Sequence, residues 1–429
     1  MEPSVIALLG LGILFVMMFL RMPISFSMFI VGFGGLYVMS SPQATFKLLS
    51  TEVWGSFSSY TLSVIPLYIL MGEIVFRAGI TEKLFEAAYR WVGHMKGGMA
   101  GTTILASAGF ASICGSNAAT AAAMGTMALP ELKKYKYNEA LSTGSVATGG
   151  TLGIIIPPST VLIVIAIQTE QSIKDLFLAS FIPGILLTTV LLLTIIYLCQ
   201  RNPEYGPAGP RFSMKEKVRS IWGVFPVLVL FAFVIGGLYM GWFTPSESGA
   251  FGAFGAIVIA LAMKKLTKEN FTLAVSNAIR SSAMVLMLIV GATFFGRFLT
   301  MTRLPFEVAE WVNGLPVPST VILVAILAIF VIGGSLMDAM GFLIISIPIF
   351  FPAVIAMGYD PVWFAVILCI VTSMGAITPP VGVNVFVVQG LTPATPITTI
   401  FRGTNYFLVS YVLFIVLLIA FPQIVLFLK

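Results

Sequence analysis

Long apolar segments separated by short polar turns dominate this chain. A run of about 20 apolar residues is long enough to cross the hydrocarbon core of a bilayer as a helix. Such runs predict ten spans, near residues 4–20, 23–40, 59–76, 138–167, 178–199, 222–243, 248–263, 281–300, 361–388 and 405–427. They divide into five per half, and an odd number per half places the two halves in opposite orientations across the membrane.

The apolar pattern of the first half recurs in the second at an offset of 222 residues. Pro130 corresponds to Pro352, and Pro157-Pro158 corresponds to Pro379-Pro380. Repeated halves with helices interrupted at corresponding positions are typical of secondary transporters, whose substrate site lies near the bilayer midplane. We therefore expect an all-α membrane protein built from two inverted-topology repeats. The predicted division is a first repeat at 1–199, a cytoplasmic linker at 200–219 and a second repeat at 220–429.

Two apolar regions, 98–130 and 317–352, do not fit single spans. Each has two apolar arms around a small polar tip, Gly115-Ser116-Asn117 in the first and Gly333-Gly334-Ser335 in the second. Arms of about 13–18 residues reach only about 20–27 Å at 1.5 Å per residue, which is less than the ~30 Å hydrocarbon core. Both regions are therefore interpreted as re-entrant hairpins, and their flanking charges indicate entry from opposite faces.

Each hairpin is followed by a helix that we expect to break in mid-membrane. Glycines and a Pro-Pro pair interrupt both segments, 138–167 and 361–388. Proline removes a backbone donor and clashes with the preceding turn, so the helix unwinds there. Unwound backbone at this depth must be buried or line a cavity, and its free carbonyl oxygens suit a small cation. One such break can also be a simple helix contact or kink, but two in register favour ion sites.

Asp338 is the one acidic residue inside a hairpin arm. An ionised group at the membrane centre costs ~2.5–3.5 kcal/mol or more and is functional by default, so a sodium ion is its expected partner. The offset maps Asp338 onto Ser116, so the two tips can supply equivalent oxygens. The alternative is a hydrogen-bonded structural aspartate. Glu73, by contrast, is expected to form an ion pair with Arg77 one helical turn further on.

Composition also indicates an integral membrane protein. Hydrophobic residues make up 58% of it and charged residues only 9%, whereas a soluble chain is about a quarter charged. The net charge of +6 comes from basic residues in short loops, which indicates membrane orientation and not nucleic-acid binding, and puts both termini in the periplasm. The segment 81–96 is amphipathic and is expected to lie in the membrane interface.

The chemistry of other function classes is missing from the sequence. An intramembrane enzyme needs paired carboxylates, a serine with a base, or a metal cluster, and the chain has a single histidine, His94, and three scattered cysteines. An ion channel needs a continuous polar pore. There is no G-x-x-x-x-G-K-[ST] loop for ATP. We therefore expect a secondary active transporter that is not an enzyme, with no cofactor and no metal other than sodium.

Four segments carry a resemblance to a known family, namely 115–122, 144–158, 334–338 and 375–380. They resemble the large membrane subunit (the M, or DctM-like, subunit) of tripartite ATP-independent periplasmic (TRAP) transporters, in order and over essentially the whole chain. More distantly, the layout is similar to the ion-transporter superfamily that includes sodium/divalent-anion symporters.

The resemblance implies sodium-coupled uptake of a carboxylate-bearing organic solute such as a C4-dicarboxylate, a sialic acid or a sugar acid. It also implies a periplasmic solute-binding protein, a small four-helix membrane subunit, the bacterial inner membrane, and an elevator movement of a transport domain against a scaffold. The small subunit is fused to the large one in some members, whereas this chain begins directly at the large-subunit start, so a separate partner is expected. The alternative is a stand-alone sodium/organic-anion symporter that needs no binding protein.

The resemblance further implies two sodium sites and a solute site between them. The first sodium site would be formed by Ser116, Asn117, Thr120, Gly149, Gly150 and Gly153. The second would be formed by Ser335, Asp338, Thr372, Gly375 and Thr378. The polar contacts to the solute would be Asn117, Ser159, Thr160 and Asn384. Because no arginine is expected at mid-membrane depth, helix N-termini and sodium itself would supply the positive field.

Overall fold

The computed structural model describes residues 2–429, and every side chain in that range except those of Ile113 and Asn313. Its regular elements are all helical within these residues. The first half contains α1 (Pro3–Phe19), α2 (Ile24–Met39), α3 (Pro42–Ser58), α4 (Val64–Arg77), α5 (Ile80–Val92), α6 (Gly98–Cys114), α7 (Asn117–Lys134), α8 (Glu139–Thr151), α9 (Thr160–Gln168) and α10 (Ile173–Arg201). The second contains α11 (Met214–Tyr239), α12 (Pro245–Ala262), α13 (Lys268–Met301), α14 (Leu304–Asn313), α15 (Ser319–Leu336), α16 (Ala339–Ala356), α17 (Pro361–Gly375), α18 (Val383–Leu391), α19 (Ile397–Ala420) and α20 (Gln423–Leu426).

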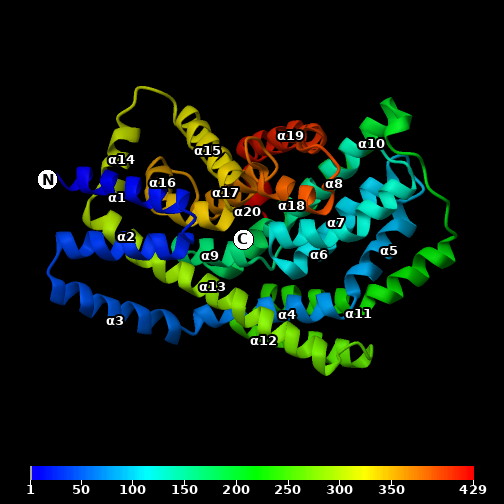
Figure 1. Ribbon diagram of the computed structural model, residues 1–429, viewed down its shortest axis with the longest axis horizontal. Coiled ribbons are helices and arrows are strands. Elements are labelled where there is room, and N and C mark those ends of the chain that lie inside the picture. Colours follow the sequence, from blue (N-terminus) through cyan, green and yellow to red (C-terminus); the bar gives the residue numbers. More distant parts are fainter. Residues whose placement is uncertain (1) are drawn as a thin grey trace.

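Helices of the two halves follow one another in the same order. α7 begins at Asn117 and α16 at Ala339, 222 residues later, and the same offset separates Glu139 and Pro361 at the starts of α8 and α17. α18 packs against α7 and α8, while α9 packs against α16 and α17 (Figure 1). Each half therefore contributes a short helix to the other half's hairpin and broken helix. The inverted orientation of the halves stays a prediction.

The segment predicted as an outer loop at 41–56 is helical. Ser41 caps α3 by accepting a hydrogen bond from the Ala44 N–H at 3.2 Å, and Pro42 occupies the first helical turn, where its missing N–H costs nothing. α3 and α4 together form a pair bent by 54°, at the place where the second half has the single long helix α13. The polar residues of α3 concealed this helix from a search for apolar runs.

Within residues 2–429, seven helices are long and apolar enough to cross a membrane, or eight if the bent pair α3–α4 counts as one span. This is fewer than the ten predicted spans, because α1 and α2 have only 17 and 16 residues and the two broken helices divide into short pieces. α15 and α16 are among the seven, although their region was predicted to be a re-entrant hairpin. Re-entry of either hairpin stays a prediction.

The connection between α10 and α11 is hydrogen-bonded to the residues on both sides of the first hairpin. α10 continues to Arg201 and α11 begins at Met214, so the connection is shorter than the predicted linker at 200–219. Its backbone accepts hydrogen bonds from Gly97 N–H at 2.8 Å and Asn138 N–H at 3.0 Å. The Tyr137 hydroxyl donates to the Pro207 carbonyl at 2.7 Å, and burial raises the pKa of this phenol to about 12, so it stays a donor at every physiological pH.

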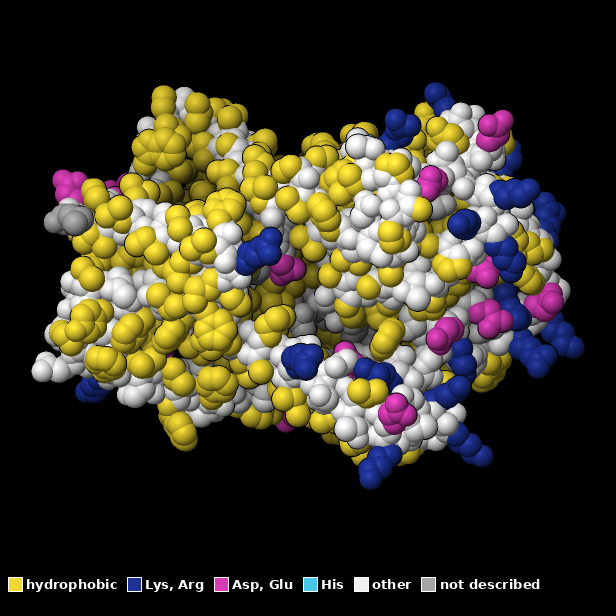
Figure 2. All heavy atoms as spheres, viewed as in Figure 1, with side chains coloured by type: hydrophobic (Ala, Val, Ile, Leu, Met, Phe, Trp, Pro, Cys, Tyr) yellow, Lys and Arg dark blue, Asp and Glu magenta, His cyan; other side chains and the backbone are white. Residues whose placement is uncertain are grey.

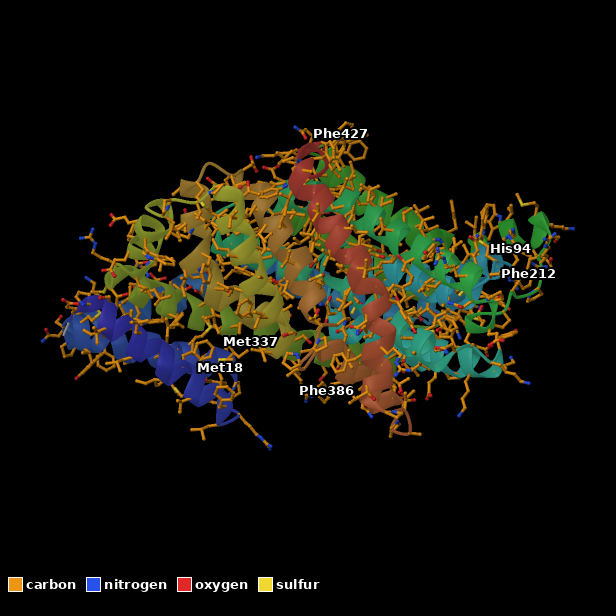
Figure 3. The ribbon with its side chains drawn as sticks, turned by 90° about the horizontal axis from the view of Figure 1, so that it is seen from above. Met18, His94, Phe212, Met337, Phe386 and Phe427 are labelled. Atoms are coloured by element: carbon orange, nitrogen blue, oxygen red, sulfur yellow. The ribbon has the colours of Figure 1, made fainter. Side chains whose placement is uncertain are left out.

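Lysine and arginine side chains gather at one end of the molecule, where α5 and the end of α10 lie (Figures 1 and 2). The opposite end, around α1 and α14, is covered largely by hydrophobic side chains on the visible face. His94 and Phe212 both lie at the basic end, and Met337, beside the second hairpin tip, lies far from them (Figure 3). This segregation is the pattern that the positive-inside rule associates with a cytoplasmic face.

Candidate ion and solute site

Both predicted helix breaks are present in the structure. α8 ends at Thr151 and α9 begins at Thr160, while α17 ends at Gly375 and α18 begins at Val383. The Pro157-Pro158 and Pro379-Pro380 peptide bonds are both cis. α8 and α17 are buried along nearly their whole lengths. The first break is buried throughout, from Leu152 to Ser159, whereas at the second break Pro379 and Pro380 are exposed. In a membrane, such exposed unwound backbone is tolerated only where it lines a cavity.

The first hairpin tip packs directly on the first break. A methyl group added to Gly153 would lie 2.4 Å from the Ser116 carbonyl oxygen and 2.7 Å from Thr120 Oγ1. Only glycine allows this close approach of two backbones. Ser116, Thr120 and Gly153, three of the predicted first sodium ligands, are thus brought together.

Buried hydroxyl groups near this contact lack hydrogen-bond partners. Thr120 Oγ1, Thr148 Oγ1 and Ser107 Oγ are buried and unpaired among the described residues, and Gly149 packs on Ser107, whose Oγ would lie 2.4 Å from an added methyl group. A buried unsatisfied polar group costs about 1–3 kcal/mol. Hydroxyl and carbonyl oxygens are the ligands that hard cations prefer. A cation bound here would satisfy atoms that the protein itself leaves unsatisfied.

Asn117, a predicted sodium and solute contact, and Asn384, a predicted solute contact, both lie against the end of α8 near Gly150. The Asn117 amide, oriented with its nitrogen towards the helix end, donates to the carbonyls of Gly150 at 3.2 Å and Thr151 at 3.1 Å. Asn384 Nδ2 donates to the Ala147 carbonyl at 3.0 Å, while its Oδ1 is buried without a partner. Since Asn384 belongs to α18, this contact ties the second half to the end of α8.

The second break packs on the end of the second hairpin's first arm. A methyl group on Gly375 would lie 2.6 Å from the Gly334 carbonyl carbon and 2.7 Å from the Val331 oxygen. Thr372 Oγ1 is buried without a partner beside Gly334. The hydroxyls of Ser335 and Thr378 donate instead to carbonyls of their own chain segment, at 2.7 and 2.8 Å. Of the three predicted hydroxyl ligands at this site, only the Thr372 hydroxyl is unpaired among the residues that the structure describes.

The second tip lies further along the chain than predicted. α15 continues through Gly333-Gly334-Ser335 to Leu336, and the turn is formed by Met337 and Asp338. The Asp338 carboxylate accepts the Met340 N–H at 3.1 Å, so it caps α16, and the residue is exposed. Ser116 caps α7 in the same way through the Ala119 N–H at 3.5 Å. Among the described residues, no hydrogen bond or ion pair joins Asp338 to the second break.

A cavity of about 460 Å³ separates the first hairpin from α4 and α13, and Figure 2 shows the surface hollowed in this region. Its polar lining comes from Glu73, Cys114, Ser116, Thr126, Thr160 and Ser281. The rest is apolar, with Phe76, Phe110 and Met284 among the larger side chains. No lysine or arginine is among its lining residues.

Residues at two helix N-termini line this cavity. Thr160, the first residue of α9, lines it, and its hydroxyl donates to the Gly115 carbonyl at 2.9 Å. Ser116, the cap of α7, lines it too. Each helix N-terminus carries about +0.5 of an elementary charge and binds anions readily. Of the predicted solute contacts, Thr160 lines the cavity, while Ser159, Asn117 and Asn384 are buried behind it.

Sequence reasoning missed several residues of this region. Glu73 forms the expected ion pair with Arg77, at 3.5 Å, but it also lines the cavity and accepts a hydrogen bond from Asn277 at 3.3 Å. Ser107 and Ser281 were overlooked because single serines in apolar helices are common. Their positions one helix away from the breaks could be recognised only in three dimensions.

Two hairpins, two helix breaks and a cavity beside one of the tips define a multi-pass helical membrane transporter. A family model for the DctM component of tripartite ATP-independent periplasmic transporters matches residues 11–424. The chain belongs to this family and is a TRAP transporter large permease subunit. Membership implies solute uptake together with a small membrane subunit and a periplasmic binding protein.

Individual relatives agree with this assignment. The chain is 32% identical over 396 residues to the C4-dicarboxylate TRAP transporter large permease protein DctM of Pseudomonas aeruginosa, with 91% of each chain covered. It is 28% identical over 408 residues to the sialic acid TRAP transporter large permease protein SiaM of Vibrio cholerae, covering 95% of this chain and 94% of that protein. These relatives are transport permeases and not enzymes.

The fold is also similar to solved structures. The crystal structure of the Alcanivorax borkumensis YdaH transporter superposes with a TM-score of 0.64 at 15% identity, covering 89% of this chain and 90% of that one. Neisseria gonorrhoeae MtrF superposes with a TM-score of 0.56 at 14% identity, covering 87% and 84% of the two chains. At this level of identity the likeness concerns the fold alone.

Proposed function

We propose that this subunit couples sodium entry to the uptake of a carboxylate-bearing organic solute across the bacterial inner membrane, with both termini in the periplasm. The observation that carries the proposal is the presence, at each break, of a threonine hydroxyl that is buried and unpaired among the described residues: Thr120 and Thr148 at the first break and Thr372 at the second. Thr120 and Thr372 each lie beside a glycine contact between hairpin and break, at Gly153 and Gly334. Two such sites suit two sodium ions.

The solute is proposed to bind in the cavity beside the first tip. Because no basic side chain lines that cavity, the amide groups at the starts of α7 and α9 would hold the carboxylate. The cavity lies between the hairpin and the pair α4 and α13. This position suits an elevator movement, in which hairpins and broken helices shift as a unit against a scaffold that includes α4 and α13.

The membrane potential can drive this cycle without ATP. Two sodium charges moving through 100 mV provide about 4.6 kcal/mol. At 1.36 kcal/mol per factor of ten, this corresponds to roughly three decades of solute accumulation before the charge of the solute and the sodium concentration gradient are counted. The negative charge of a monocarboxylate halves the contribution of the membrane potential, and for a dicarboxylate the sodium concentration gradient alone drives uptake.

The test is uptake in proteoliposomes that contain this subunit with its small partner subunit and the cognate binding protein. We expect accumulation of a radiolabelled carboxylate under an inward sodium gradient, and none when potassium replaces sodium. Uptake that is equal under both gradients would refute sodium coupling. A parallel experiment without the binding protein examines the alternative, since uptake that persists there would identify a stand-alone symporter.

A further inference from the structure

A charged groove separates α5 from α11 at the basic end of the molecule. Its volume is about 480 Å³, and Lys83, Glu86, Arg90, Glu216, Arg219, Ser220 and Gly223 line it. On α5 these residues follow a spacing of three and four, and on α11 of three, one and three, so each helix presents one face to the groove. The solute cavity and the two breaks share no lining residue with it.

The carboxylates of this groove are already engaged. Glu216 Oε2 accepts hydrogen bonds from the Ser213 N–H at 2.8 Å and the Ser213 hydroxyl at 2.7 Å, which caps α11. Glu86 pairs with Arg90 at 2.5 Å. Lys83 and Arg219, in contrast, form no ion pair among the described residues. The groove therefore presents two cations that lack a partner.

The side chain of Lys83 packs against α11, which keeps its ammonium group in the groove. An added methyl group on Gly223 would lie 3.7 Å from Lys83 Cδ, so the aliphatic part of the lysine passes over this glycine. Burying the stem while the ammonium group reaches polar surroundings is the usual behaviour of lysine at a membrane boundary. Arg90, which is paired with Glu86, lies two helical turns after Lys83 on α5 and donates a hydrogen bond to the Glu216 carbonyl at 3.5 Å.

Exposed tryptophans mark the depth of the groove. Trp91 on α5 is 39% exposed and Trp222 on α11 is 66% exposed. Tryptophan concentrates at the headgroup level of a bilayer. Trp91 is also fixed in place, because its Nε1 donates to the Lys217 carbonyl at 3.2 Å. The two aromatic rings thus place the groove at the membrane–water interface.

An apolar cavity of about 290 Å³ lies further along the same face of α11, with Leu84 of α5 and Val227 and Phe231 of α11 among its lining residues. A polar, anion-sized groove followed by an apolar cavity has the two chemical parts of a phospholipid. Basic pockets between helices on the cytoplasmic side bind lipid headgroups.

We propose that this groove binds the phosphate of an anionic phospholipid through Lys83 and Arg219, with an acyl chain in the apolar cavity beside Leu84, Val227 and Phe231. The bound lipid bridges α5 to α11. Because α5 packs against α6, the first arm of the first hairpin, the lipid also braces the helix beside the hairpin. This proposal does not depend on sodium coupling or on the identity of the solute.

The test uses the delipidated complex of this subunit with its small partner subunit, titrated with phosphatidylglycerol, phosphatidylcholine or inorganic phosphate. Bound lipid is counted by native mass spectrometry. We expect saturable binding of phosphatidylglycerol, much weaker binding of phosphatidylcholine, and no competition by millimolar inorganic phosphate. The double variant Lys83→Gln with Arg219→Gln should bind phosphatidylglycerol about 30-fold more weakly, since each basic group near an anionic surface contributes about 1 kcal/mol.

Matched variants separate the site from a general charge effect. Lys265→Gln with Lys268→Gln removes two charges at the turn between α12 and α13 and should bind as the wild type does, while Lys83→Arg should retain affinity. Equal binding of the two lipids, equal weakening in both double variants, or displacement by inorganic phosphate would each overturn the proposal. Size-exclusion profiles check that the variants remain folded, and a variant that elutes as the wild type but keeps full affinity also contradicts it.

Discussion

The two helix breaks are built alike but differ in which elements supply free hydroxyl groups. At the first break both the hairpin, at Thr120, and the broken helix α8, at Thr148, have a buried hydroxyl without a partner among the described residues. At the second break the hydroxyl belongs to the broken helix, at Thr372, the residue 222 positions after Gly150. The residue equivalent to Thr120 is Phe342, which is buried and apolar.

This difference explains why the two sites need not share a ligand list. A cation needs oxygens at suitable positions in space, and either element can provide them. The constraint common to both sites is the close backbone contact, made by Gly153 in one and Gly375 in the other. Variants at equivalent positions in the two halves therefore test which features both sites need and which features only one site needs.

The largest effects are expected at the two contact glycines. Gly153→Ala places a methyl group 2.4 Å from a carbonyl oxygen, and Gly375→Ala places one 2.6 Å from a carbonyl carbon. These contacts are with backbone, so relief requires the hairpin to move away from the break, at about 1–3 kcal/mol. We expect each variant to lower sodium-driven uptake at least about tenfold, measured as initial rates in proteoliposomes at equal protein density.

Gly236→Ala is the matched control for the glycine pair. A methyl group there meets no atom within 4 Å, and alanine favours helix by about 1 kcal/mol over glycine. Uptake should be unchanged. If Gly153→Ala and Gly375→Ala transported as well as this control, the close contacts would have no role in ion binding.

A second comparison concerns the helix caps Asp338 and Ser116, which occupy equivalent positions. Asparagine caps a helix as well as aspartate does, so Asp338→Asn keeps α16 capped while removing the charge. If the carboxylate binds sodium, the half-saturating sodium concentration should rise about tenfold or more, because an amide offers only a dipole to the cation. Ser116→Ala should change it less, since the Ser116 carbonyl, and not its hydroxyl, faces Gly153.

Asp338→Ala extends this test. It removes both the charge and the cap, and losing a cap costs about 1 kcal/mol. A sodium role predicts that Asn and Ala variants share the same loss of sodium dependence. A purely structural role predicts that only the Ala variant is affected, through a lower melting temperature, with sodium dependence unchanged.

Sequence patterns were sufficient for the parts of the molecule that proline and glycine determine. The Pro-Pro pairs located both breaks, because proline disrupts a helix whatever surrounds it. The polar helix α3 was missed, since apolar periodicity cannot reveal a helix that buries only Thr45. The second tip was placed too early, because Gly333 and Gly334 permit a turn but here serve close packing against Phe342 and Thr372.

The site itself was predictable in part. Thr120 and Thr372 were expected ligands, and both have unpaired hydroxyls. The cavity was not expected, because Glu73, Thr126 and Ser281 come from three helices far apart in the chain. No spacing rule relates residues whose proximity depends on how α4, α7 and α13 pack.

The smallest effects are expected at the hydroxyls of Thr120 and Thr372, and here the direction of the change in melting temperature distinguishes an ion ligand from an ordinary buried hydroxyl. Thr120→Val and Thr372→Val replace a hydroxyl by a methyl group of similar size and remove a buried unsatisfied atom that costs about 1–3 kcal/mol. In sodium-free buffer both variants should therefore melt at the same temperature as the wild type or higher. Sodium should stabilise the two variants less than it stabilises the wild type, with an apparent affinity for sodium lower by about five- to tenfold.

Thr188→Val is the control, because the buried Thr188 hydroxyl donates to the Gly184 carbonyl at 2.8 Å. This variant should melt at a lower temperature without sodium and keep the full sodium-dependent shift in melting temperature. Should the Thr120 and Thr372 variants behave like this control, the hydroxyls would be satisfied in the free protein and would not be ligands of the coupling ion.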